Sequence, residues 1–294
     1  MILSIDFHIF KRYTKHDKRI KMIFKYCVLV GFSFIWVNNS NGQLLLTKDT
    51  VESIISSNPA FTIYKDNYFI TGSTLSDVPD KYNSDAKYQI SFKQRLVNQP
   101  LPFGFYPFLS YTQKTFWDIY VNSSPFAESN YNPSIFIIRP FFKKNLLHSS
   151  LILSIEHESN GRDRADGSKS WNFFSATYCK IITSKAMVSL KLWIPVGLSD
   201  NPDLMEYIGH GEATCYWVIK ENRLTADMIA RKGTSWDWKG SFQINIAFRP
   251  FRIRNQYLML QWCYGYAESL IDYQQKHNIL RVGLVLKPTF YRFY

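Results

Sequence analysis

The sequence predicts an all-β fold, a transmembrane antiparallel β-barrel of about 12 strands in a single domain. Three observations carry this prediction. Apolar and polar residues alternate with a period of two over about a dozen segments of roughly 8–12 residues. Aromatic side chains make up 17% of the 294 residues, and many of them cluster at segment ends. Long connections between the segments are scarce, as expected when neighbouring strands are joined by tight turns.

Composition and charge exclude two other classes of protein. Only 20% of the residues are charged while aromatic residues are abundant, which excludes intrinsic disorder. A single apolar run approaches membrane-spanning length for a helix, which excludes a helical membrane bundle. The formal net charge of +12 is concentrated at the start, where residues 1–42 carry seven basic and two acidic side chains.

The first 42 residues resemble an export signal. Basic residues precede a mostly apolar run from Met22 to Val37, and a short polar stretch follows before Gln43. This is the order of regions in a secretory signal peptide, so we expect residues 1–42 to be removed and 43–294 to form the mature domain. Met22 is an alternative translation start. The competing interpretation is a single N-terminal membrane anchor.

The strand segments follow one another through the rest of the chain. They lie near residues 61–72, 88–93, 103–115, 134–143, 149–159, 171–182, 186–196, 212–221, 223–231, 241–248, 256–266 and 279–286. A tilted strand needs about 9–11 residues to cross a bilayer, and a sheet in lipid must close so that no edge is left unpaired. A secreted β-sandwich alternates in the same way and is the competing fold, but strand length, aromatic excess and short loops favour the barrel.

Common catalytic and metal-binding motifs are missing from the sequence. There is no Gly-x-Ser-x-Gly elbow, phosphate loop, His-Glu-x-x-His pair or dinucleotide fingerprint, and no nucleic-acid partner is expected. The four cysteines include no Cys-x-x-Cys pair, which argues against a disulfide framework or a zinc site. Cys27 lies in the signal segment, and the other three fall in strand-like segments as small apolar fillers.

One stretch, residues 150–174, places chemically active side chains on one face of a predicted hairpin. Leu153 and Ile155 define the apolar face of the first strand, and His157 and Ser159 continue that face. In a membrane barrel the apolar face contacts lipid, so both side chains would point outward. Asn172 lies on the apolar face of the next segment, beside His157 if the two segments pair.

These residue types suit a hydrolase. Ser159 is a weak nucleophile unless a base such as His157 removes its proton, and the amide oxygen of Asn172 could hold the imidazole in one tautomer. Gly161 offers an unhindered backbone N–H for an oxyanion, and the loop from Arg162 to Ser168 offers the hard oxygen ligands that Ca²⁺ prefers. The competing interpretation is ordinary turn chemistry followed by a solvated loop.

The same residues carry a resemblance to a known family. His157-x-Ser-Asn-Gly-Arg162 followed by Ser168-x-Ser-Trp-Asn172 is similar to the signature of the outer membrane phospholipase A family. Further blocks agree in order, namely Tyr111-Thr-Gln-Lys114, Ser123-Ser-Pro-Phe126 with Asn130-Tyr131, Asp200-Asn-Pro-Asp203 and Tyr264-Gly-Tyr-x-Glu-Ser-Leu-Ile-Asp-Tyr273. The similarity extends from about Phe61 to the end of the chain.

The resemblance implies a fold and a catalytic site. It implies a twelve-stranded barrel in which Ser159, His157 and Asn172 form a triad on the lipid-facing surface. It also implies that Gly161 donates its N–H to the oxyanion, together with water bound to Ca²⁺.

The resemblance further implies a calcium site and a dimer. In the family, the ion is held by the carbonyl matching Arg162, the hydroxyl matching Ser168 and a partner subunit's carbonyl matching Ser123. The resemblance thus implies that the active form is a homodimer, with Gln113 matching a family residue buried at the dimer contact.

The chain departs from the family pattern in the calcium loop and beside the triad. Six residues rather than five separate Gly161 from Ser168, and Lys169 and Phe173 stand where arginines are usual. The triad positions themselves are intact.

The sequence therefore predicts a calcium-dependent phospholipase in the outer membrane of a Gram-negative bacterium. We expect it to hydrolyse A1 and A2 acyl esters of phospholipids, and lysophospholipids as well. Two alternatives from other classes are a non-catalytic barrel, either pore or structural protein, and a soluble β-sandwich binder.

Overall fold

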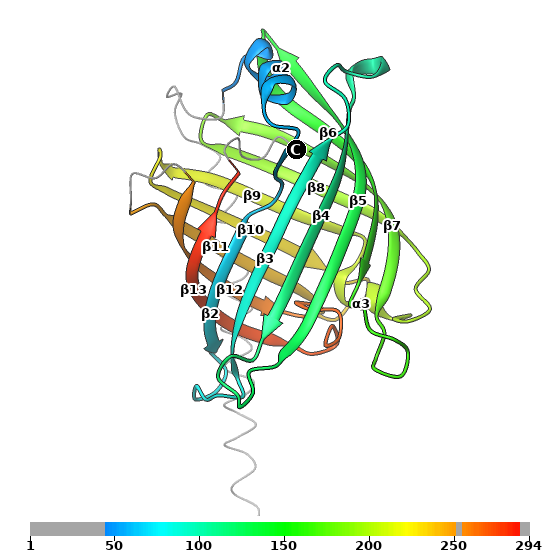
Figure 1. The fold of residues 1–294 in the computed structure, drawn as a ribbon, viewed down its shortest axis with the longest axis vertical. Coiled ribbons are helices and arrows are strands. Elements are labelled where there is room, and N and C mark those ends of the chain that lie inside the picture. Colours follow the sequence, from blue (N-terminus) through cyan, green and yellow to red (C-terminus); the bar gives the residue numbers. More distant parts are fainter. Residues whose placement is uncertain (1–44, 251–254, 289–294) are drawn as a thin grey trace, which may run out of the picture. The chain divides into compact units, whose positions relative to one another are not determined.

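The computed structural model describes residues 45–250 and 255–288, which form one closed antiparallel sheet (Figure 1). The predicted signal segment, residues 1–42, lies outside the described residues. Neighbouring strands pair in the order β1-β3-β2-β13-β12-β11-β10-β9-β8-β7-β6-β5-β4, and β4 also pairs with β3. This last pairing closes the sheet, which removes the free edges that lipid does not tolerate.

Most of the strands are ten or more residues long. Their bounds are β1 Phe61–Ile63, β2 Asn67–Thr74, β3 Ser84–Arg95, β4 Tyr106–Trp117, β5 Phe126–Lys143, β6 Leu146–Ser159, β7 Ser170–Thr183, β8 Ala186–Val196, β9 Gly211–Lys220, β10 Leu224–Lys232, β11 Gly240–Phe248, β12 Gln256–Gly265 and β13 His277–Leu286.

The barrel has twelve strand positions because β1 and β2 share one of them. Both pair with β3, with Ile63 opposite Phe92 and Tyr68 opposite Gln89, and only three residues separate them. The run predicted over 61–72 is therefore one strand with an interruption, and the twelve-strand barrel is confirmed. The predicted start of β5 is wrong: the strand begins at Phe126, not near residue 134, because the outward positions Ser129 and Pro133 weaken the apolar alternation there.

The alternation of the sequence separates an outer face from a lumen. The side chains of Ile155, Phe174 and Ile194 are 54%, 53% and 70% exposed on the outer surface of three neighbouring strands. Their sequence neighbours face inward, where Glu156 Oε1 lies 2.6 Å from Lys191 Nζ. Apolar residues outside and paired polar residues inside are the arrangement of a membrane barrel.

A helix that the sequence did not indicate fills one end of the lumen. Helix α2, Lys48–Ser57, buries Val51, Ile54 and Ile55 against lumen-facing residues of β4 to β6. Arg95 donates to the carbonyls of Ile55 and Asn58 at the end of the helix. With only ten residues in α2, the three-and-four spacing of its apolar residues is too brief to stand out.

The other end of the barrel is filled by a second apolar cluster. The short helix α3, Leu204–Ile208, lies in the β8–β9 connection, and Figure 1 shows α2 and α3 near opposite ends. Leu204 and Ile208 pack with Trp171, Trp193 and other residues, including part of the β12–β13 connection. Among the described residues, no helix is long and apolar enough to span a membrane.

Ion pairs join the first strands of the barrel to the last one. Arg281 on β13 is 1% exposed and binds Asp85 on β3 with two contacts of 2.6 Å. It also contacts Glu268 at 2.6 Å, and Lys87 Nζ lies 2.9 Å from the same carboxylate. Burial alone would raise the pKa of Glu268, which lies in the β12–β13 connection, but Arg281 and Lys87 hold it well below its usual range.

Candidate active site

The hairpin of β6 and β7 brings the predicted catalytic residues together on the outer face. His157 pairs directly with Asn172, and Ser159 pairs with Ser170. The Nδ1 atom of His157 lies 2.9 Å from Oδ1 of Asn172. Asn172 is exposed, as is Phe174 two residues further on the same face. The juxtaposition expected from strand parity is therefore observed.

The hydrogen bond determines which nitrogen of His157 is free. An amide oxygen only accepts, so Nδ1 carries the proton and Nε2 is left as a base. Ser159 follows two residues later on the same face, half-buried. Within the described residues the ring makes no hydrogen bond to Ser159, and such contacts often tighten only when substrate is bound.

Gly161 occupies a position that other residues would not fit. Its φ of +68° lies in the left-handed region, and an added Cβ would be 2.8 Å from Cε2 of Tyr131. Tyr131 on β5 is the residue directly opposite Ser159 in the sheet. The backbone N–H of Gly161 has no acceptor among the described residues, so it is available to a ligand near Ser159.

A buried asparagine that the sequence analysis did not single out shapes the loop after Ser159. Asn160 is 4% exposed, and its Nδ2 donates to the carbonyl of Gly167 at 3.0 Å. Its Oδ1 accepts from the backbone N–H groups of Arg162 and Lys169. One side chain thus holds both ends of the loop at fixed positions. An asparagine immediately after a strand is the one sequence signal for this role.

Hard oxygen donors gather at the predicted calcium position. The hydroxyl of Ser168 donates to Oδ2 of Asp200 at 3.0 Å, and the hydroxyl of Ser170 donates to the same atom at 3.1 Å. Lys169 Nζ donates to the backbone carbonyl of Asp200 at 3.1 Å. The β8–β9 connection therefore delivers a carboxylate to the hydroxyl that the sequence singled out, in a contact that the sequence analysis did not anticipate.

The other two predicted calcium ligands lie in different surroundings. The side chain of Arg162 turns back to β5, with Nε 3.3 Å from Oε2 of Glu128. Ser123 stands in the exposed β4–β5 turn with a φ of +67°, and no hydrogen bond joins it to the Arg162–Ser168 loop in the described part of the chain. Nor do the described residues contain a cluster of three His, Cys, Asp or Glu side chains suited to a metal.

The loops around this site are tied to one another. Asp203 accepts hydrogen bonds from the hydroxyl of Tyr273 and from Nε2 of Gln274, which joins the β8–β9 connection to the β12–β13 connection. Burial would raise the pKa of Asp203, but the hydrogen bonds from Tyr273 and Gln274 outweigh it and lower this pKa. The ammonium of Lys169 lies 5.6 Å from the ring centre of Tyr273.

Gln113 belongs to a row of polar side chains on the outward-facing side of β4, in which Thr115 is itself fully buried. Its Oε1 accepts from the hydroxyl of Tyr111 at 3.1 Å, and its Nε2 donates to Oγ1 of Thr115 at 3.2 Å. Thr115 in turn bonds Ser129 at 2.9 Å. Polar groups facing lipid are costly unless they are paired, and this row satisfies part of that demand within one chain.

Known sequences place this arrangement in a family. The phospholipase A1 profile matches residues 52–286. The chain is 29% identical over 191 residues to phospholipase A1 of Escherichia coli K12, covering 62% of either chain. It is 28% identical over 191 residues to phospholipase A1 of Klebsiella pneumoniae, covering 62% of this chain and 63% of that one. The chain thus spans less than two thirds of the length of these curated relatives.

Solved structures match over more of the chain. Outer membrane phospholipase A from E. coli superimposes with a TM-score of 0.68 at 26% identity, covering 81% of this chain and 99% of that one. A Salmonella typhi outer membrane phospholipase, solved as a dimer with bound calcium, gives a TM-score of 0.69 at 25% identity, with coverages of 86% and 100%. An E. coli structure carrying an active-site asparagine-to-alanine change matches as well. On the profile match across most of its length, the chain belongs to the phospholipase A1 family.

Proposed function

We propose that the chain is an outer membrane phospholipase that hydrolyses acyl ester bonds of phospholipids with Ser159, His157 and Asn172. The observation that carries the proposal is the 2.9 Å contact between His157 and Asn172, on the outer surface of the barrel and on the same strand face as Ser159. Family membership supports the reaction class. The active-site asparagine of the E. coli relative supports the role given to Asn172.

The proposed reaction proceeds through an acyl-enzyme. Ser159 Oγ attacks the acyl carbonyl while Nε2 of His157 takes the hydroxyl proton, and His157 then gives this proton to the departing glycerol oxygen. A water molecule, deprotonated by the same nitrogen, then attacks the carbonyl of the acyl-enzyme. The fatty acid leaves, and His157 returns the proton to Ser159 Oγ. Asn172 accepts from Nδ1–H throughout and keeps the imidazole oriented.

Two features favour this chemistry at a lipid-facing position. The backbone N–H of Gly161, which has no acceptor in the part of the chain that the structure describes, would donate to the oxyanion that forms beside Ser159. The site lies next to exposed apolar residues such as Ile155 and Phe174, so an acyl chain reaches it without leaving the hydrocarbon. A1 and A2 esters and lysophospholipids are the proposed substrates, because an open surface imposes little selection on the rest of the lipid.

Calcium fits the donor set at the end of the Arg162–Ser168 loop. The hydroxyl of Ser168 and the carboxylate of Asp200 lie 3.0 Å apart, and both are oxygen ligands of the kind Ca²⁺ prefers. The carbonyl of Arg162 and a carbonyl matching Ser123 from a partner subunit are the remaining proposed ligands. Bound there, the ion would supply positive charge that stabilises the oxyanion. The calcium-bound Salmonella relative supports this assignment.

The active form is proposed to be a homodimer that joins the outer polar rows of two chains. Gln113 stands in such a row on an otherwise apolar surface, where a second copy would cover it. The dimeric state of the Salmonella relative supports this pairing. Export by a signal peptide in residues 1–42, followed by one barrel domain in 43–294, completes the proposal and agrees with location in a Gram-negative outer membrane.

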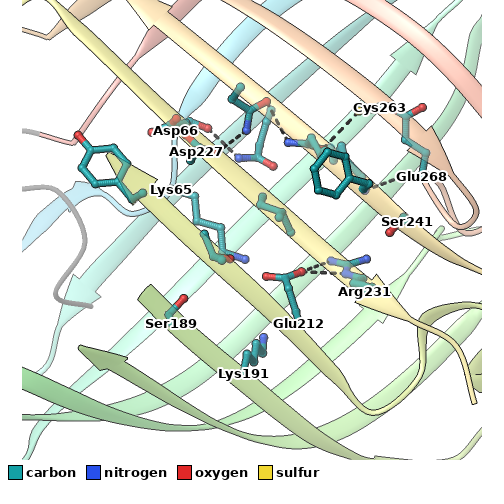
Figure 2. Close-up of a pocket in the computed structure, with 18 of the residues that line it drawn as sticks. Lys65, Asp66, Ser189, Lys191, Glu212, Asp227, Arg231, Ser241, Cys263 and Glu268 are labelled. Atoms are coloured by element: carbon teal, nitrogen blue, oxygen red, sulfur yellow. Dashed lines mark hydrogen bonds and ion pairs between the residues drawn. The ribbon is translucent and has the colours of Figure 1, made fainter. Parts of the chain in front are cut away.

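The lumen argues against the alternative of a passive pore. Apolar clusters around α2 and α3 occupy the barrel, and ion pairs line the lumen wall. A cavity of about 370 Å³ remains in the lumen. Figure 2 shows residues that line it, with Glu212 and Arg231 paired across neighbouring strands and Lys65 and Lys191 nearby. A twelve-stranded barrel filled in this way leaves little room for conduction.

Fatty-acid release by the detergent-purified protein tests the proposal. Activity should require Ca²⁺, disappear with a chelator, and fall by roughly 10³-fold or more in Ser159→Ala. Ser154→Ala is the matched control, because Ser154 lies on the same strand but bonds Glu156 and Ser175 in the lumen. Hydrolysis that survives in Ser159→Ala would refute the site, and hydrolysis that survives chelation would refute the role of calcium.

A further inference from the structure

The backbone carbonyl of His157 points toward β5. Asn160 N donates to the carbonyl of Lys169 across the β6–β7 hairpin at 3.0 Å. Successive residues of a strand direct their backbone groups to opposite neighbours, so residue 158 also faces β7 while His157 and Ser159 face β5. The carbonyl of His157 therefore needs a donor from β5.

The register places a proline where that donor should be. Tyr131 pairs with Ser159 and Ser134 pairs with Glu156, so Pro133 stands opposite His157. Proline has no backbone N–H and cannot make the ladder bond. The interruption falls on the peptide group that leads from His157 to Glu158, between the proposed base and the proposed nucleophile.

A side chain on the lumen side replaces the missing donor. Nδ2 of Asn132 lies 2.9 Å from the carbonyl oxygen of His157. Asn132 lines a lumen cavity with Glu158 and Lys114, behind the wall that carries the triad. Lys114, which lines the same cavity, donates instead to the backbone carbonyl of Glu268.

We propose that Asn132 is a positioning residue for His157, acting through the backbone from inside the barrel; the proposal rests on the catalytic role of His157 given above. Its amide restores the hydrogen bond that Pro133 removes, and so fixes the strand between base and nucleophile. Asn132 cannot touch a substrate on the outer surface, because the sheet lies between them. Its loss should therefore change kcat and leave KM unchanged.

The test compares Asn132→Ala and the isosteric Asn132→Asp with the parent protein in mixed micelles of phospholipid and detergent. Both variants lose the donor, and we expect kcat to fall about tenfold with KM within twofold, since small displacements of a catalytic group carry costs of this order. The double variant Asn132→Ala with Pro133→Ala regains a backbone N–H opposite His157. It should recover most of the lost kcat.

Controls separate positioning from folding and from the proposed function. A sample that migrates more slowly on a gel after boiling than before it contained folded barrels. Ser154→Ala is a lumen-facing change on β6 that should leave kcat intact. An unchanged kcat in folded Asn132→Asp, or a loss that Pro133→Ala does not repair, would overturn the inference. Full activity in Ser159→Ala would instead overturn the proposed function on which it rests.

Discussion

Replacing Asn172 by alanine measures how much a neutral residue contributes by orienting the base. The change removes the acceptor 2.9 Å from Nδ1 of His157 and leaves the ring free to rotate and to change tautomer. A neutral hydrogen bond contributes about 0.5–1.5 kcal/mol net, and about 1.4 kcal/mol corresponds to a tenfold change in rate. Because the contact faces lipid, where competition from water is weak, we expect a loss in kcat near the upper end, about tenfold.

The assay is steady-state hydrolysis of a monoacyl phospholipid with saturating Ca²⁺, run beside Asn172→Asp. The carboxylate accepts the same bond and stabilises the imidazolium more strongly, so Asn172→Asp should retain kcat within a fewfold of the parent. A loss in Asn172→Ala as large as that in Ser159→Ala would show that Asn172 does more than orient His157. An unchanged kcat would show that it does not orient the base at all.

Three further predictions concern the loop, the outer surface and the response to acid. Gly161→Ala should reduce kcat about 10²-fold or more, because a Cβ there meets Tyr131 at 2.8 Å and displaces the oxyanion donor; retained activity at normal Ca²⁺ would contradict this. Gln113→Leu should weaken calcium-dependent dimerisation, measured by sedimentation in detergent, while Leu109→Ala on the same strand serves as the control; equal dimer affinity in Gln113→Leu would argue for a different contact. The pKa of Asp203 is lowered in the folded protein, so its contribution to loop stability is fully present above the unfolded value of 3.8 and is lost as pH falls below it. Hydrogen exchange in the β8–β9 connection should accelerate as pH drops from about 5 to 3, after correction for intrinsic rates, and Asp203→Asn should remove that pH dependence.

The outer face of the β6–β7 hairpin was predictable because it depends on local sequence alone. Alternation assigns His157 and Ser159 to the face of Ile155, and Asn172 falls on the matching face of the strand that follows in the chain and pairs with it. No long-range packing enters that argument. The contact of Asp200 with Ser168 could not be derived in the same way, because it depends on how the β8–β9 connection folds over a loop 32 residues earlier.

Elements inside the lumen were also beyond prediction. Helix α2 is short, and its burial of Val51 and Ile55 depends on a cavity that exists only once the barrel has closed. The contact of Asn132 with His157 depends on the register that sets Pro133 opposite the histidine, and register follows from pairing rather than from composition.

The buried charges of Arg281 bear on how the barrel is assembled. Glu268 lies close to Arg281 in the chain, but the other partner, Asp85 on β3, is 196 residues away, so the two-contact pair forms only when the first and last strands meet. A sheet left open between β2 and β13 would leave Asp85 without Arg281, and Arg281 with Glu268 alone, which is unfavourable for charges in a nonpolar medium. Pairing of β2 with β13 is therefore coupled to formation of this ion pair, and a barrel whose sheet has not closed is an unfavourable intermediate.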